Sequence, residues 1–187
     1  MMSKRVQFAA EWTILTTIGI VIGTWIGADQ VGLVQGILGD ILLGLIVGVV
    51  QTVVLLRHFR DHSRSLVWWI ADCTLAFTAG AVLGRRVAPF LLNYGTLVAT
   101  MGFGLTMGVS HGVLQWLVLS RTALFQSRAI RWIAVGFAAW FLGELVGTGF
   151  GLIQWQFWLS IPTGLAIGLV MGIGWITLMG VYEKAAR

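Results

Sequence analysis

Six long apolar runs occupy most of the chain and restrict what it can fold into. They cover residues 8–28, 31–56, 66–84, 93–119, 130–151 and 162–182. About 20 helical residues, each rising about 1.5 Å, cross the roughly 30 Å hydrocarbon core of a bilayer. The runs do not alternate between polar and apolar residues, as the strands of a membrane barrel do. The sequence therefore predicts an all-α fold, a polytopic transmembrane helical bundle of six spans, in a single integral membrane domain over residues 1–187.

The composition agrees with burial in lipid. Hydrophobic residues make up 58% of the chain and charged residues 10%, and the mean hydropathy is +0.90. A soluble domain carries about 25% charged residues, so this chain lacks the polar side chains to cover a water-facing surface. The net charge of +5 does not indicate nucleic-acid binding, because the basic residues stand at the ends of apolar runs rather than in a patch with aromatic residues.

The placement of lysine and arginine predicts the orientation. Short cytoplasmic loops carry an excess of these two residues. Ten of the 12 basic residues flank the same ends of the runs: Lys4, Arg5, Arg57, Arg60, Arg64, Arg121, Arg128, Arg131, Lys184 and Arg187. Only Arg85 and Arg86 flank the opposite ends. We therefore expect both the N-terminus and the C-terminus to be cytoplasmic.

Two spaced patterns indicate an internal repeat. A tryptophan followed by glycines 11 and 15 residues later opens the first, third and fifth runs: Trp12, Trp69 and Trp132. In the second, fourth and sixth runs, two glycines four residues apart precede a large side chain: Gln51, Gln115 and Trp175. Self-similarity at about 60 residues marks a repeated supersecondary unit. It predicts three helical hairpins, about residues 8–60, 66–122 and 129–183, and it favours retention of the first run as a span rather than its removal as a signal peptide.

Most of the 25 glycines recur at four-residue steps within the runs. Lipid tails are as apolar as leucine, so transmembrane helices associate through close backbone approach, which small residues permit. We expect these G-x-x-x-G steps to form the packing faces between helices. A glycine-lined passage for a solute is the functional alternative.

Polar residues inside the runs are the only functional leads, because an ionisable group in the bilayer costs about 2.5 kcal/mol or more. His111 lies ten residues from Arg121, a helical rise of about 15 Å, which places it near the bilayer centre. Glu144 lies 12 residues beyond Trp132, a rise of about 18 Å. The candidate intramembrane polar site comprises His111, Glu144, Gln51, Gln115, Arg85 and Arg86.

These candidates have structural as well as functional interpretations. Glu144 could form an ion pair with Arg85 or Arg86, or stay protonated and hydrogen-bonded across helices; the functional alternative is proton or cation handling. His111 could be a neutral histidine satisfied by a neighbouring helix, or a ligand for a chlorin, a haem or a metal. No second transmembrane histidine exists, which excludes a bis-histidine haem within one chain.

The other polar and aromatic residues of the runs are expected to be structural. Gln51 and Gln115 lie about 9 Å inside the cytoplasmic ends of their runs, where they would form hydrogen bonds between helices or contact a substrate. Tryptophans favour membrane interfaces, and the sequence places an interfacial belt at Trp12, Trp68, Trp69, Trp132, Trp155 and Trp158. Glu11 and Asp72 are expected at the cytoplasmic interface and Asp40 near the outer one, with residues 29–40 either a helix or an interfacial loop.

No catalytic or metal site is predicted. The segment around Ser110 matches G-x-S-x-G, but a hydrolase elbow requires a strand–turn–helix and this segment is in the middle of a predicted helix. Ser110 and His111 are adjacent on that helix and do not face each other. The single cysteine, Cys73, excludes an internal disulfide and a multi-cysteine metal site.

The sequence thus favours a non-enzymatic integral membrane subunit. It would be an accessory or assembly component that packs within a larger membrane complex or a homo-oligomer, with the lipid bilayer and other membrane subunits or itself as partners. The first alternative is a small transporter or channel component for a small solute or ion. The second is a pigment- or lipid-binding subunit. No cofactor is required by the sequence, and a chlorin ligated by His111 belongs to this second alternative.

Overall fold

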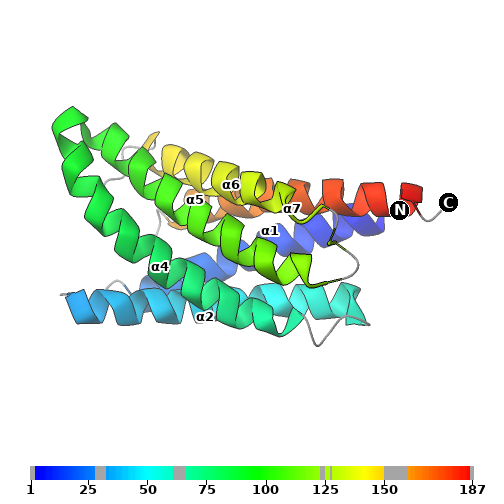
Figure 1. Cartoon of the computed structure of the whole chain (residues 1–187). Helices are drawn as coiled ribbons and strands as arrows, with labels where there is room; N and C mark the ends of the chain where they lie inside the picture. The colour runs from blue at the N-terminus through cyan, green and yellow to red at the C-terminus, as the bar shows by residue number, and fades with distance from the viewer. Residues whose placement is uncertain are drawn as a thin grey trace.

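The computed structural model describes residues 3–27, 33–60, 66–122, 125–126, 128–149 and 160–185. Within them the chain is all-helical and has no strand. The long helices are α1 (Lys4–Gly27), α2 (Leu33–His58), α4 (Trp68–Leu91), α5 (Thr96–Ser120), α6 (Arg131–Gly149) and α7 (Ser160–Ala185), as Figure 1 shows. A short 3-10 turn, η2 (Leu92–Tyr94), joins α4 to α5. The expected all-helical fold is therefore correct.

Five of these helices, α1, α2, α4, α5 and α7, are long and apolar enough to cross a membrane. The sixth, α6, has 19 residues. It is not among these five helices, and its described residues begin at Arg131 and include Glu144. Five such helices are compatible with an integral, multi-pass membrane protein.

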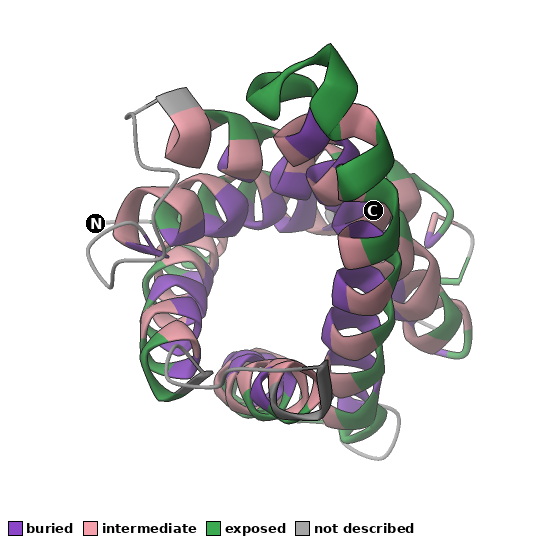
Figure 2. Cartoon of the chain, turned by 90° about the vertical axis from the view of Figure 1, so that its left-hand side faces the viewer, coloured by how far each residue is buried: buried purple, intermediate pink, exposed green. Residues whose placement is uncertain are grey.

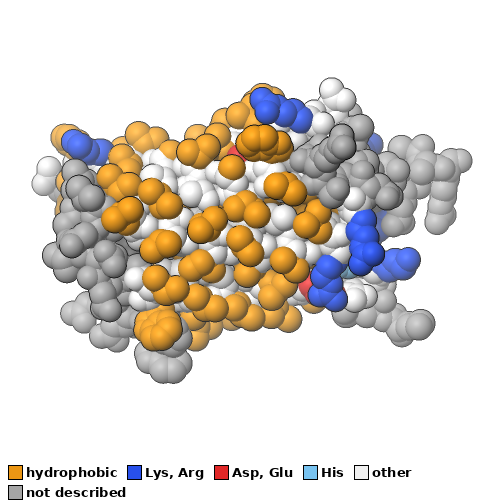
Figure 3. Space-filling view, turned by 90° about the horizontal axis from the view of Figure 1, so that it is seen from below, with side chains coloured by type: hydrophobic (Ala, Val, Ile, Leu, Met, Phe, Trp, Pro, Cys, Tyr) orange, Lys and Arg blue, Asp and Glu red, His pale blue; other side chains and the backbone are white. Residues whose placement is uncertain are grey.

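The six helices form a closed ring. Each packs against its neighbours in the chain, and α7 closes the ring by packing against α1. Figure 2, which looks along the bundle, shows the buried faces turned toward the axis and the exposed faces turned outward. The exposed residues of the helices include many large apolar side chains, such as Ile14, Val49 and Leu169. In Figure 3, apolar side chains cover the middle of the viewed face, and lysines and arginines lie around its edges, several of them at the right-hand end.

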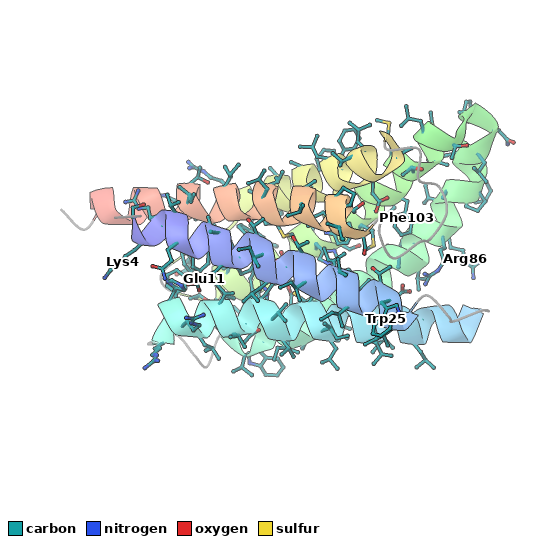
Figure 4. All side chains as sticks on the ribbon, turned by 180° about the vertical axis from the view of Figure 1, so that it is seen from behind. Lys4, Glu11, Trp25, Arg86 and Phe103 are labelled. Carbon is teal, nitrogen blue, oxygen red and sulfur yellow. The ribbon has the colours of Figure 1, made fainter. Side chains whose placement is uncertain are left out.

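The two ends of the bundle differ in charge and connection. Lys4 and Glu11 lie near the end that carries both termini, and Arg86 lies near the opposite end (Figure 4). At this opposite end, α4 continues as a helix beyond the apolar run, which stops at residue 84, and ends at Leu91. The turn that follows depends on Gly95, whose φ of 108° lies in the left-handed region that favours glycine.

The start of the second span is helical where the structure describes it. α2 begins at Leu33 and includes Gly36 and Asp40. The alternative in which the segment before Ile41 forms an interfacial loop is therefore wrong for residues 33–40. Residues 29–32 lie outside the described ranges.

Several glycines lie directly against the backbone of the next helix. A Cβ atom added to Gly112 on α5 would lie 2.8 Å from Ile133 Cα on α6. One added to Gly44 on α2 would lie 2.7 Å from Thr74 Cα on α4. Real Cβ atoms do not approach backbone atoms this closely, so any larger side chain would push these helices apart. Glycine thus sets the distance between helices at these two contacts.

Candidate functional site

Gln51 hydrogen-bonds to two neighbouring helices from the inner face of α2. The Trp69 indole N–H on α4 donates to its side-chain oxygen at 2.8 Å. Its amide nitrogen donates to the Thr16 hydroxyl on α1 at 3.0 Å. The Cys73 thiol also donates weakly to the same amide oxygen at 3.4 Å. Gln51 is 2% exposed, so these bonds hold α1, α2 and α4 together away from water.

Gln115 is bonded in a similar way on α5. The Trp132 indole N–H on α6 donates to its side-chain oxygen at 2.7 Å, and its amide nitrogen approaches the Cys73 sulfur at 3.5 Å. A continuous polar chain therefore runs through five helices, from Thr16 through Gln51, Cys73 and Gln115 to Trp132. The amide oxygens of both glutamines accept hydrogen bonds from buried indole N–H groups, and these bonds position the helices. Both oxygens therefore have their partners within the bundle.

An aromatic cluster fills the axis at the end of the ring that carries both termini. Trp175 on α7 stands at its centre, with ring centroids 4.8–6.1 Å from those of six other aromatic residues: Phe8, Trp12, Phe59, Trp69, Phe125 and Trp132. Trp12, Trp69 and Trp132 are fully buried. The prediction that these three belong to an interfacial belt is therefore wrong. Trp68 is 68% exposed, and Trp155 and Trp158 lie outside the described residues.

His111 lies inside the ring, 2% exposed. Its Nδ1 is 2.9 Å from the Met107 carbonyl oxygen on its own helix. Its ring packs edge-on against Phe77 at 4.5 Å and obliquely against Trp140 at 4.7 Å, centroid to centroid. The His111 Nε2 and the Trp140 Nε1 are both buried and have no hydrogen-bond partner among the described residues. The hydrogen bond of His111 is thus to its own helix α5, whereas the neutral-histidine interpretation expected a partner on a neighbouring helix.

A cavity of about 10 Å³ lies beside His111 at the axis of the ring. Each of the six helices contributes to its lining, among them Thr16, Gln51, Phe77, His111, Trp140 and Met171. Pockets that bury drug-sized ligands measure about 300–1,000 Å³, so this cavity has no room for a chlorin or a haem. The geometry around His111 does not favour a macrocycle ligand.

Glu144 on α6 faces α5 rather than a basic residue. A Cβ added to Gly104 would lie 3.0 Å from Glu144 Cγ. Arg85 instead forms a two-pronged ion pair with Asp40, in which Nη1 donates to Oδ1 at 3.3 Å and Nη2 contacts Oδ2. Within the described ranges, neither Arg85 nor Arg86 pairs with Glu144. The ion pair expected for Glu144 is therefore wrong, because α4 packs against α2, which supplies the acid that Arg85 meets, whereas α6 lies on the far side of α5.

Two acidic residues that the sequence placed at the interface differ in the structure. Glu11 is half-buried and contacts α2, with its Oε2 3.2 Å from His58 Nε2 and 3.5 Å from Arg57 Nη1. Asp72 is 6% exposed, and its Oδ2 has no hydrogen-bond partner among the described residues. An interfacial position fits Glu11, whereas Asp72 is enclosed by the bundle. Its position between Trp69 and Cys73, which both face inward, was the signal that sequence reasoning missed.

The arrangement offers little chemistry beyond hydrogen bonding. No group of three histidine, cysteine, aspartate or glutamate residues within the described part of the chain is placed to hold a metal ion. The sequence-derived candidates do not form one site: Gln51, Gln115 and His111 face the ring interior, whereas Arg85 forms a separate ion pair with Asp40. Comparison with protein families, with curated proteins and with solved structures finds no match for this chain. Its own geometry is therefore the basis for assigning a role.

Proposed function

We propose that the chain crosses the membrane six times as three related hairpins, α1–α2, α4–α5 and α6–α7. This proposal is supported by a contact between a glycine and an apolar residue that recurs within each hairpin: Gly23 against Leu43, Gly80 against Met107, and Gly143 against Ile167. Each apolar residue directly precedes the first glycine of the pattern in the second helix of its hairpin. The 19 residues of α6 rise about 28 Å, close to the thickness of the hydrocarbon core, so α6 is the sixth span of this proposal.

Contacts between consecutive hairpins support the same repeat, with one difference. Two junctions match: Gly44 against Thr74, and Gly108 against Phe137. At the third junction, between α7 and α1, Gly164 lies against Thr17, whereas the sequence pattern aligns Gly168 with Gly44 and Gly108. In this proposal α7 is shifted by one helical turn where it closes the ring on α1.

In the proposed role, the protein is a non-enzymatic membrane subunit that assembles with itself or with other membrane proteins. The observation that carries this proposal is that contacts within the chain itself fill the interior of the ring. The buried amide oxygens accept from indoles of the same chain, and the aromatic cluster around Trp175 fills the axis. A ring whose interior is used for its own cohesion has its apolar outer face left for partners.

Mass measurement of the native particle tests this role. The full chain would be extracted from its own membrane in polymer-bounded lipid discs, without detergent, and weighed by native mass spectrometry. We expect a particle heavier than one 20.4 kDa chain plus lipid, and Glu144→Gln should leave its mass unchanged or reduce it. A particle that contains one chain and no other protein would contradict the assembly role.

A small transporter or channel component is the second candidate function. The observation that favours it is the cavity at the axis, to which all six helices contribute, together with the acidic Glu144 in α6. Purified protein in liposomes would be tested for proton and cation flux. Flux that Glu144→Gln abolishes while the helical circular dichroism spectrum is retained would favour this function over assembly.

A further inference from the structure

The residues that line the cavity beside His111 include one with a buried, unpaired acceptor and others with donor groups on neighbouring helices. The Met107 carbonyl oxygen can only accept, so the His111 Nδ1 that contacts it at 2.9 Å carries a hydrogen. In a neutral imidazole the other ring nitrogen is then an acceptor. The His111 Nε2 is therefore a buried acceptor, and no described residue donates to it.

Two residues with donor groups line the same cavity from two other helices. The Trp140 indole N–H on α6 is buried and has no acceptor among the described residues. Gln51 on α2 also lines the cavity, and an amide nitrogen has two hydrogens, of which one is donated to Thr16. Leaving such buried groups unpaired costs about 1–3 kcal/mol each. A molecule that can donate to His111 and accept from Trp140 would satisfy both.

Charge and size restrict what that molecule can be. A cation would meet the Trp140 N–H, and an anion would meet the His111 Nε2 lone pair, so the site fits a neutral molecule that both donates and accepts. The volume of about 10 Å³ is near the minimum of about 10–15 Å³ that one water molecule needs. Buried waters typically have two to four polar partners, and Gln51 on α2, His111 on α5 and Trp140 on α6 are the lining residues that could supply them.

We infer that the axial cavity is a binding site for one water molecule, which donates to His111 Nε2 and accepts from the Trp140 indole N–H. This inference is independent of the assembly role, because it concerns the interior of one chain. The water would connect α5 to α6 at the axis of the ring, beside Gln51 of α2. It makes His111 a hydrated residue of the bundle core.

Water-edited solid-state NMR on the full chain in lipid bilayers tests the inference, with ¹⁵N in histidine and in the tryptophan indole. We expect rapid magnetisation transfer from water to the His111 imidazole, with hydrogen on Nδ1 and a hydrogen-bonded Nε2. The Trp69 and Trp132 indole signals report on the fold, because their acceptors are glutamines. A His111 that carries hydrogen on Nε2, or that receives no magnetisation from water, would overturn the inference.

A cavity-filling pair of variants locates the water. Val47→Ile adds one methylene at a residue that lines the cavity, whereas Val49→Ile adds it at a residue that is 42% exposed on the outer face of the same helix. Transfer to His111 should be lost in Val47→Ile and kept in Val49→Ile, with the Trp69 and Trp132 signals unchanged in both. Transfer that persists in Val47→Ile would place the water elsewhere and contradict the site.

Discussion

The Trp69 indole N–H donates a 2.8 Å hydrogen bond to the Gln51 side-chain oxygen across the interface between α4 and α2. Both side chains are buried, so neither group can exchange its partner for bulk water. In lipid the helices gain little from hiding apolar surface from each other. A bond of this kind therefore contributes a larger share of helix association than it would in a soluble protein.

Removing this acceptor should destabilise the bundle. Gln51→Leu leaves the Trp69 N–H buried without a partner, and we expect a loss of about 1–2 kcal/mol in the free energy of unfolding. The measurement is an SDS titration in mixed micelles, followed by helical circular dichroism. The matched control is Gln126→Leu, the same substitution at an exposed residue outside the helices, which should have no effect. Equal losses in the two variants would refute the role of the bond.

Glycine contacts predict opposite outcomes for the same substitution at two positions. Gly112→Ala would place its Cβ 2.7 Å from the Ile133 carbonyl oxygen, so the helices must separate, at a cost of about 1–3 kcal/mol. A Cβ on Gly36 would meet no atom within 4 Å, so Gly36→Ala should be neutral or stabilise α2 by up to about 1 kcal/mol. The same SDS titration compares the two variants. A destabilised Gly36→Ala, or a neutral Gly112→Ala, would show that the helix spacing differs from that described.

The sequence predicts a depth along each helix by counting residues from its charged ends, but it could not predict which way a side chain points around the helix. Gln51 and Gln115 were placed inside the bilayer by counting residues from Arg57 and Arg121, which remains a prediction, and the structure shows that both face the interior of the ring. The helices are apolar on nearly every side, so periodicity does not separate an inward face from a lipid-facing one. Trp69 was therefore expected at the membrane interface, although it lies in the core.

The sequence also could not predict which charged residues of different helices form a pair. Arg85 was expected to reach Glu144, but it meets Asp40, because α4 packs between α2 and α5 while α6 lies on the far side of α5. The order of helices around a ring determines which charges meet. No run of residues taken alone contains that order, and Asp40 and Arg85 are 45 residues apart.

The one-turn shift that we propose for α7 against α1 predicts a substitution that adds a hydrogen bond. In α2 and α5, a glutamine seven residues after the contacting glycine accepts from the tryptophan of the next helix. Counting seven residues from Gly164, which contacts α1, gives Met171, and the Trp12 indole N–H has no partner among the described residues. Met171→Gln is similar in volume and should provide the missing acceptor.

The test of this substitution is spectroscopic. In Met171→Gln, the Trp12 indole proton should shift downfield to the range of Trp69 and Trp132, with stability within about 1 kcal/mol of the wild type, since one new hydrogen bond offsets the burial of an amide. Met171→Leu, which offers no acceptor, is the control. If the Trp12 signal is the same in both variants, the proposed one-turn shift is wrong.

The pair between Asp40 and Arg85 predicts a difference between adjacent arginines. Arg85 is half-buried against α2, whereas Arg86 is exposed. We expect Arg85→Leu to cost about 1 kcal/mol and Arg86→Leu to cost nothing measurable. Exchanging the charges, Asp40→Arg with Arg85→Asp, should recover part of the loss in a double-mutant cycle. Equal effects of the two single variants in the SDS titration would argue against a contribution from the pair.

Cysteine labelling tests the orientation that the basic residues predict. The only native cysteine, Cys73, is buried in the bundle, so the wild-type chain should give almost no background with a membrane-impermeant maleimide. Asn93→Cys and Gln126→Cys place an exposed thiol at opposite ends of the bundle, in the turn between α4 and α5 and in the connection between α5 and α6. If the ten basic residues face the cytoplasm, intact cells should label only Asn93→Cys, and Gln126→Cys should react only after the membrane is permeabilised. The reverse pattern would invert the orientation, and labelling of both variants in intact cells would mean that α5 does not cross the membrane.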